Sequence, residues 1–178
     1  MRLVNLVGTR CRDGDAAALR RWYADHVHQL FAFDGLLEAR LLAREGAGRG
    51  TAPEFLCLYD FESAAAFADY EAGPVRAAAA ADRALGWGHD GIEITLRQAY
   101  TRQYRRAGPA PAAPRWSVTA LQVDAATERS LAATIDGALE LCRSATEPPS
   151  FLLLTEGAAP HDAVQWQADY AKLLHWTR

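Results

Sequence analysis

The chain has 178 residues, half of them hydrophobic, and a formal net charge of -3 at pH 7. This length suits one medium domain, or a small domain with an appendage. The slightly acidic balance argues against nucleic acid as a partner, because phosphate binding needs a basic face. No apolar run approaches the roughly 20 residues of a membrane-spanning helix, and the first residues do not have the pattern of a signal peptide. We therefore expect no membrane association.

Cysteine usage is the next constraint on the class of protein. The three cysteines, Cys11, Cys57 and Cys142, are odd in number and far apart. They match neither a disulfide framework nor a zinc-binding motif. We interpret them as reduced thiols in a cytoplasmic protein, and we predict neither a metal site nor a cofactor.

The first 105 residues alternate between apolar runs that favour strands and amphipathic stretches that favour helices. The predicted strands cover residues 3–11, 36–42, 55–61 and 92–105, and the predicted helices cover about 15–31, 64–72 and 75–85. The strands at 3–11 and 55–61 are apolar on both faces, so both faces of their sheet need cover. This order is the split β-α-β, ferredoxin-like plan of an α+β fold, whose helices cover one face only.

Two stretches of unusual composition interrupt these elements. Residues 43–53 are rich in glycine but lack the Gly-Lys-Ser/Thr ending of a phosphate-binding loop, so we interpret them as a flexible hairpin connection. Residues 107–114 are rich in proline and alanine and form a linker. The linker divides a ferredoxin-like domain at 1–106 from a second part at 115–178.

The second part is predicted to have the order β-α-β-α, with strands at 116–123 and 151–155 and helices at 127–142 and 162–176. The segment Trp166–Leu174 matches Trp22–Leu30 at four of nine positions. The match is either chance in an alanine-rich chain or the trace of a degenerate, incomplete repeat. The second sheet face is covered either by residues 115–178 or by the sheet of a second chain.

The helix around His26 carries the clearest candidate for chemistry. Its residues at three- and four-residue spacing form one stripe, namely Leu19, Trp22, Tyr23, His26, Val27 and Leu30. The stripe is apolar apart from the imidazole at its centre. Since His28 lies about 200 degrees further round the helix, the two histidines cannot share a metal ion.

The first 105 residues resemble the dimeric α/β-barrel superfamily, and within it the EthD-like proteins. The resemblance rests on the pattern Trp22-Tyr23-Ala24-Asp25-His26, on Asp34-Gly35-Leu36 leading to Arg40, and on the segment from Tyr59 to Ser63 followed by Phe67 and Tyr70. It implies a ferredoxin-like domain whose sheet packs against a second sheet to form a barrel. Family members often have a proline where this chain has His28. Relatives range from small monooxygenases and polyketide-modifying enzymes to accessory proteins.

These observations select His26 as the catalytic candidate. An imidazole with a pKa of about 6.5 suits a general base or acid acting on a phenol or an acidic carbon. The alternative is a histidine whose hydrogen bond is satisfied in the core. The candidates for substrate binding are Trp22, Tyr23, Asp60, His89 and Tyr100, whose alternative roles are packing, capping, turns and interfaces.

The predicted function is binding of a hydrophobic, aromatic or polyketide-like small molecule, with cofactor-free proton-transfer or oxygenation chemistry of the cyclase or monooxygenase type at His26. The alternatives are a non-catalytic ligand-binding or accessory protein and a structural oligomer. The predicted assembly is a homodimer formed by sheet-to-sheet packing.

Overall fold

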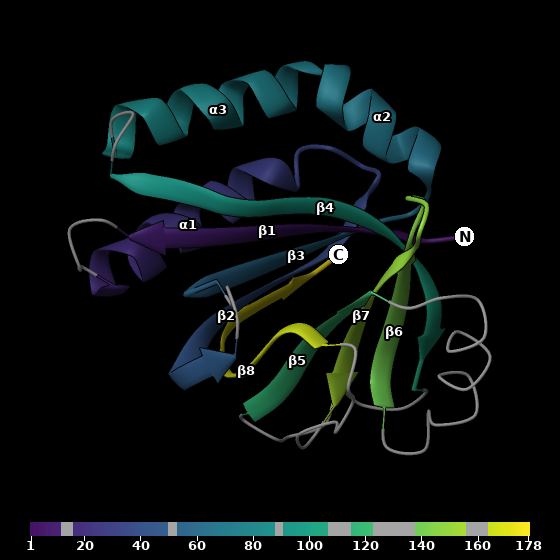
Figure 1. Ribbon diagram of the computed structural model, residues 1–178. Coiled ribbons are helices and arrows are strands. Elements are labelled where there is room, and N and C mark those ends of the chain that lie inside the picture. The colour runs from purple at the N-terminus through teal and green to yellow at the C-terminus, as the bar shows by residue number, and fades with distance from the viewer. Residues whose placement is uncertain (12–15, 50–52, 88–90, 107–114, 123–137, 156–163) are drawn as a thin grey trace.

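The computed structural model describes residues 1–11, 16–49, 53–87, 91–106, 115–122, 138–155 and 164–178 (Figure 1). Its three helices are α1 (Ala16–Leu30), α2 (Ala64–Ala72) and α3 (Pro74–Trp87). Its eight strands are β1 (Leu3–Cys11), β2 (Leu36–Arg49), β3 (Phe55–Phe61), β4 (Ile92–Arg105), β5 (Arg115–Gln122), β6 (Ala138–Ser144), β7 (Ser150–Thr155) and β8 (Val164–Thr177). The α+β class predicted from the sequence is confirmed.

The eight strands close into a barrel in the order β1-β3-β2-β8-β5-β7-β6-β4. Every pair of neighbouring strands is antiparallel. Strands β1–β4 come from the predicted ferredoxin-like part, and strands β5–β8 come from the part after residue 114. The barrel is therefore closed within one chain, with β8 joining β2 and β6 joining β4.

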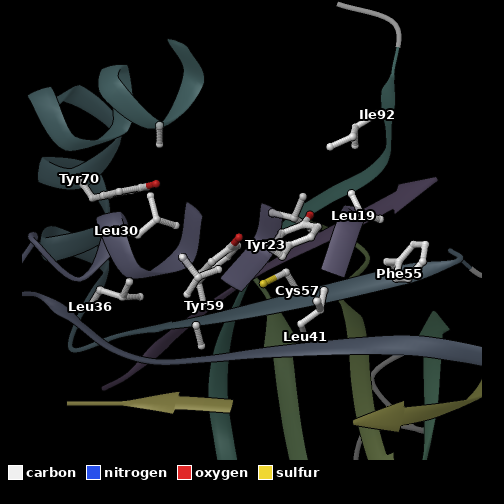
Figure 2. Close-up of a cluster of buried hydrophobic side chains, with 14 of the residues drawn as sticks. Leu19, Tyr23, Leu30, Leu36, Leu41, Phe55, Cys57, Tyr59, Tyr70 and Ile92 are labelled. Carbon is white, nitrogen blue, oxygen red and sulfur yellow. The ribbon is translucent and has the colours of Figure 1, made fainter. Parts of the chain in front are cut away.

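Strands β1 and β3 bury both of their faces, as their composition predicts. In β1, Leu3 and Val7 belong to the apolar cluster beneath the helices, whereas Val4 and Leu6 belong to the cluster inside the barrel. Neighbouring side chains of a strand point to opposite faces, so these two clusters lie on either side of one sheet. Figure 2 shows part of the cluster on the helix side.

All three helices lie over the half of the barrel that β1–β4 form (Figure 1). The predicted helix stripe of α1 is confirmed, because Leu19, Tyr23, Val27 and Leu30 are all buried against the sheet. Helix α2 begins as predicted at Ser63, whose side chain accepts a hydrogen bond from the backbone N–H of Ala66. Among the described helices, none has the length and apolar composition needed to cross a bilayer.

Two predicted helices of the second part are wrong where the structure describes them. Residues 138–142, expected at the end of the helix at 127–142, belong to β6, and the helix expected at 162–176 is β8 where it is described; residues 127–137 lie outside the described residues. In β8 the side chains of Trp166, Ala168 and Tyr170 enter the barrel at a spacing of two. The segment contains Ala, Lys and Leu residues that favour a helix, but its pairing with β2 and β5 outweighs this preference and makes it a strand. The similar stretches Trp22–Leu30 and Trp166–Leu174 are helical and extended, respectively.

The predicted hairpin connection at 43–53 is also corrected, because β2 continues to Arg49. Gly46 has a φ of 69°, in the left-handed region that favours glycine. The register between β2 and β8 shifts between Glu45 and Arg49, on either side of this glycine. The glycine thus allows the strand to pass an irregularity in the ladder instead of ending the strand.

The single-chain barrel bears on the predicted assembly. The sheet face that a homodimer was expected to bury is occupied by β5–β8 of the same chain. The homodimer, and the division of the chain into separate domains, stay predictions.

Candidate functional site

His26 lies at the contact between α1 and α3 and is 8% exposed. Its Nδ1 atom is 2.8 Å from Oδ2 of Asp82, which α3 contributes. The ring stacks on Trp22, one turn earlier in α1, with 4.2 Å between ring centres and an angle of 24°. The imidazole is thus held on one side by a carboxylate and on its face by an indole.

The hydrogen bond to Asp82 determines what the ring can do chemically. A carboxylate only accepts hydrogen bonds, so Nδ1 carries the proton and Nε2 has a free lone pair when the ring is neutral. Burial lowers the pKa of His26 from its usual value, Asp82 opposes this effect, and the nearby charges of Arg83 and Arg76 add to it. At neutral pH the ring is therefore an uncharged base.

The same ring lines a cavity of about 60 Å³ between the helices and the sheet. Strands β1, β3 and β4 form the floor, and the three helices form the walls and roof. Three tyrosine rings, Tyr23 from α1, Tyr59 from β3 and Tyr70 from α2, meet in this layer (Figure 2). This volume is small beside the roughly 300–1,000 Å³ of pockets that enclose drug-sized ligands.

Two polar groups of the cavity wall have no hydrogen-bond partner among the residues that the structure describes. They are the buried atoms Asn5 Oδ1 and Trp22 Nε1. Asn5 is only 4% exposed, and an unsatisfied buried polar group costs about 1–3 kcal/mol. Unpaired groups of this kind gathered around one cavity are typical of a place where a polar ligand or water binds.

Positive charge also gathers around the cavity. Arg76 and Arg83 come from α3, and Arg97 comes from β4. Arg97 is exposed and the other two are half-buried, so these side chains mark where the cavity opens to solvent. Ile94, an exposed apolar residue of β4, lines the same opening.

The structure brings together only some of the predicted site residues. Trp22 and Tyr23 line the cavity with His26, whereas Asp60 and Tyr100 lie on the opposite face of the sheet, inside the barrel. The hydroxyl of Tyr100 donates a hydrogen bond to Gln98 Oε1. His89 lies outside the described residues. The role of each predicted residue in catalysis or binding stays a prediction.

Asp60 belongs to a buried ion network that joins the two halves of the barrel. Its Oδ2 atom is 2.5 Å from Nη2 of Arg102 and 3.5 Å from Nη2 of Arg40. Glu140 of β6 accepts from Arg40 at 2.8 Å and from Arg102 at 2.7 Å. At one end of the network, Glu38 pairs with Arg105. Burial raises the pKa of Asp60 to about 6, against the opposing charges of Arg40 and Arg102, so the group is ionised at neutral pH.

Several residues of the site, in the cavity wall or bonded to His26, were not predicted from the sequence. Asp82, Arg83 and Arg97 come from segments whose pattern gave no sign of chemistry. Asn5 and Thr9 did leave a signal, because they are polar residues on one face of an otherwise apolar strand. Asn5, Val7 and Thr9 are spaced by two residues, so their side chains point to the same face of β1. In the sheet this face lies beneath His26.

Comparisons with known proteins give a likeness in fold. No family model matches the sequence, and no curated protein matches it. The crystal structure of a proposed monooxygenase from Fusobacterium nucleatum superimposes with a TM-score of 0.62 at 10% identity, covering 99% of this chain and 94% of that one. An anthrone oxidase-like protein gives 0.58 at 10% identity, covering 99% and 92%.

A proposed chlorite dismutase gives a TM-score of 0.56 at 8% identity, with 97% of this chain and 94% of that chain covered. Identities this low establish shared architecture and do not transfer an activity. The chain therefore has the ferredoxin-like α/β-barrel fold of those proteins, and its barrel is closed within a single polypeptide.

Proposed function

We propose that this protein is a cofactor-free enzyme of the EthD-like type, which removes a proton from a small aromatic or polyketide-like molecule with His26. The observation that carries the proposal is the buried, neutral imidazole whose Nδ1 is bonded to Asp82 while the ring lines a cavity. A general base needs a free lone pair and a partner that stabilises the positive charge it acquires. The Asp82 carboxylate supplies that stabilisation.

The surrounding groups suit a substrate that becomes negatively charged. When Nε2 takes a proton from an acidic carbon, the electron pair stays on the substrate and spreads to a neighbouring ketone oxygen as an enolate. The indole N–H of Trp22 is available to stabilise the enolate oxygen, and the positive charges of Arg83 and Arg97 favour an anion in this cavity. The names of the structural neighbours, which include monooxygenases and an anthrone oxidase-like protein, support this class of chemistry.

The proposed reaction with oxygen is balanced without a cofactor. The carbanion bonds to O2, and the proton held by His26 passes to the resulting peroxide. The hydroperoxide then loses water, so that a CH2 group becomes a ketone and the second oxygen atom leaves as water. His26 ends in its starting state.

The size of the cavity requires one structural change. A tricyclic substrate does not fit within about 60 Å³, so we propose that α3 moves outward when such a molecule binds. Among the residues of α3, Ala79 alone is buried, and Val75 and Trp87 pack partly buried against the core, so the movement exposes the apolar surface of these three residues. The hydrogen bond that His26 Nδ1 donates to Asp82 would re-form over the bound substrate.

The test uses anthrone, a tricyclic ketone with an acidic CH2 group. Oxygen uptake and formation of the quinone are measured above the spontaneous rate for the wild type, His26→Gln and His28→Gln. His28 lies on the exposed side of the same helix and is the matched control. We expect His26→Gln to lower the rate by about 10²–10⁴-fold, the usual contribution of a general base, and His28→Gln to leave it unchanged. Equal rates for the wild type and His26→Gln would refute the proposal.

A further inference from the structure

We propose that the substrate carries a carboxylate, which Arg83 and Arg97 bind at the opening of the cavity. This inference rests on the proposed function for the position of the reacting group at His26. It adds the chemical class of the substrate and the residues that select it.

The first step of the argument is the pairing of charges around the opening. Arg76 is matched by Glu71, with 3.2 Å between Nε and Oε1, and Asp82 is engaged by His26. Arg83 and Arg97 form no ion pair with any residue that the structure describes. The chain as a whole is acidic, with a net charge of -3, so two unmatched guanidinium groups at one opening are a local feature.

The second step is that both charges act on the interior of the cavity. Burial raises the pKa of Tyr23, and the positive charges of Arg83 and Arg97 partly oppose that rise. The two arginines come from different elements, one from α3 and one from β4, and both line the cavity. A planar guanidinium matches a planar carboxylate in shape and hydrogen bonding, so a carboxylate at this opening suits both.

The third step concerns the rest of the substrate. Asn5 Oδ1 and Trp22 Nε1 are buried polar atoms of the cavity without a hydrogen-bond partner among the described residues. The Asn5 oxygen can accept from a substrate hydroxyl, and the Trp22 N–H can donate to a ketone oxygen, at the end that reaches inward near His26. Because the cavity has a volume of only about 60 Å³, the charged end of the substrate is placed at the opening, where Arg97 is exposed. The best-fitting class is therefore an aromatic acid with a hydroxyl or ketone group remote from its carboxylate.

The test compares two probes of nearly equal shape, 2-naphthoate and its uncharged amide, 2-naphthamide. Binding is measured by isothermal titration calorimetry to the wild type, Arg83→Gln, Arg97→Gln, Arg97→Lys and Arg21→Gln. Arg21 is an exposed arginine of α1 that does not line the cavity and is the matched control. Thermal unfolding of each variant checks that it is folded.

We expect the wild type to bind naphthoate about tenfold or more tightly than the amide, because a guanidinium forms charge-assisted hydrogen bonds with a carboxylate that it cannot form with an amide. Arg83→Gln and Arg97→Gln should each lose most of the preference for naphthoate, while their affinity for the amide changes little. Arg97→Lys should keep part of the preference, and Arg21→Gln should keep all of it. Equal affinity for the two probes, an equal loss of both in the glutamine variants, or no binding of either probe at millimolar concentration would overturn the inference.

The His26→Gln variant separates this inference from the proposed function. It should still prefer naphthoate, because its arginines are intact, while it no longer removes protons. Loss of turnover with retained charge preference supports both statements. Charge preference in a protein whose turnover does not depend on His26 would refute the proposed function alone.

Discussion

Replacing Arg40 by methionine tests whether the buried ion network holds the two halves of the barrel together. Arg40 is 2% exposed and donates to Glu140 of β6, and it also lies 3.5 Å from Asp60 of β3. Methionine fills much of the same volume but leaves Asp60 and Glu140 with Arg102 as their closest cation, and Asp60 also with Arg105 at 3.7 Å. Removing one member of a buried ion pair costs about 3–5 kcal/mol, because the carboxylates that stay buried lose part of the charge that compensates them.

That cost is a large part of the roughly 5–15 kcal/mol by which a domain is stable. For a chain of this size each kcal/mol shifts the melting temperature by about 2–4 °C, so we expect a fall of roughly 6–20 °C. Urea unfolding followed by circular dichroism gives the free energy directly. The control is Arg10→Met, which removes an ion pair on the surface. The side chains of Arg10 and Glu54 in this pair are 53% and 35% exposed, so the substitution should lower the free energy of unfolding by only about 0–1 kcal/mol.

The pH dependence gives a sharper test of the same mechanism. Loss of Arg40 raises the pKa of Glu140 and of Asp60, and the latter is already raised to about 6 in the intact protein. A carboxyl group whose pKa is higher in the folded state binds more protons there, so its ionisation destabilises the fold as pH rises. The difference in stability between Arg40→Met and the wild type should therefore shrink from pH 8 to pH 5. A cost below about 1 kcal/mol, or a cost independent of pH, would refute the reasoning.

Three further changes are expected to have measurable effects. Asp82→Asn removes a carboxylate that raises the pKa of His26, so the NMR titration midpoint of the ring should move to lower pH, and an unchanged midpoint would contradict the assigned pairing. Ser63→Ala removes the cap of α2 and should cost about 1 kcal/mol in urea unfolding; no loss would show that the cap is dispensable. A Cβ added at Gly8 would lie 2.6 Å from Cγ of Pro53, so Gly8→Ala should cost about 1–3 kcal/mol through overpacking, and a melting temperature equal to that of the wild type would argue against the close approach.

The first half of the fold could be predicted because its signals are local. The stripe of α1 and the two-faced strands are patterns of period 3.6 and 2 that need no knowledge of distant residues. Strand β8 was missed because its alternation of Trp166, Ala168 and Tyr170 is embedded among residues that favour helices. Its pairing with β2, more than a hundred residues away in sequence, decides its structure.

The candidate site, like the fold, could be predicted only in its local part. The stripe identified His26 and its aromatic neighbours, since all of them lie on one helix. Its partner Asp82 is 56 residues away on another helix, and the sequence between them does not fix how those helices pack. Asp60 was expected on the inner face of the barrel and lies there, but the ion network that engages it depends on Glu140, contributed by a strand predicted as helix.

Closure of the barrel within one polypeptide has a consequence for how the protein can change over time. In an assembly of two identical subunits, rotational symmetry repeats every substitution on both sides, and dilution separates the subunits. Here the strands before and after the linker are encoded once each and are held at a fixed ratio of one to one. Either half is therefore free to diverge in sequence without a matching change in the other, and the barrel persists at any protein concentration.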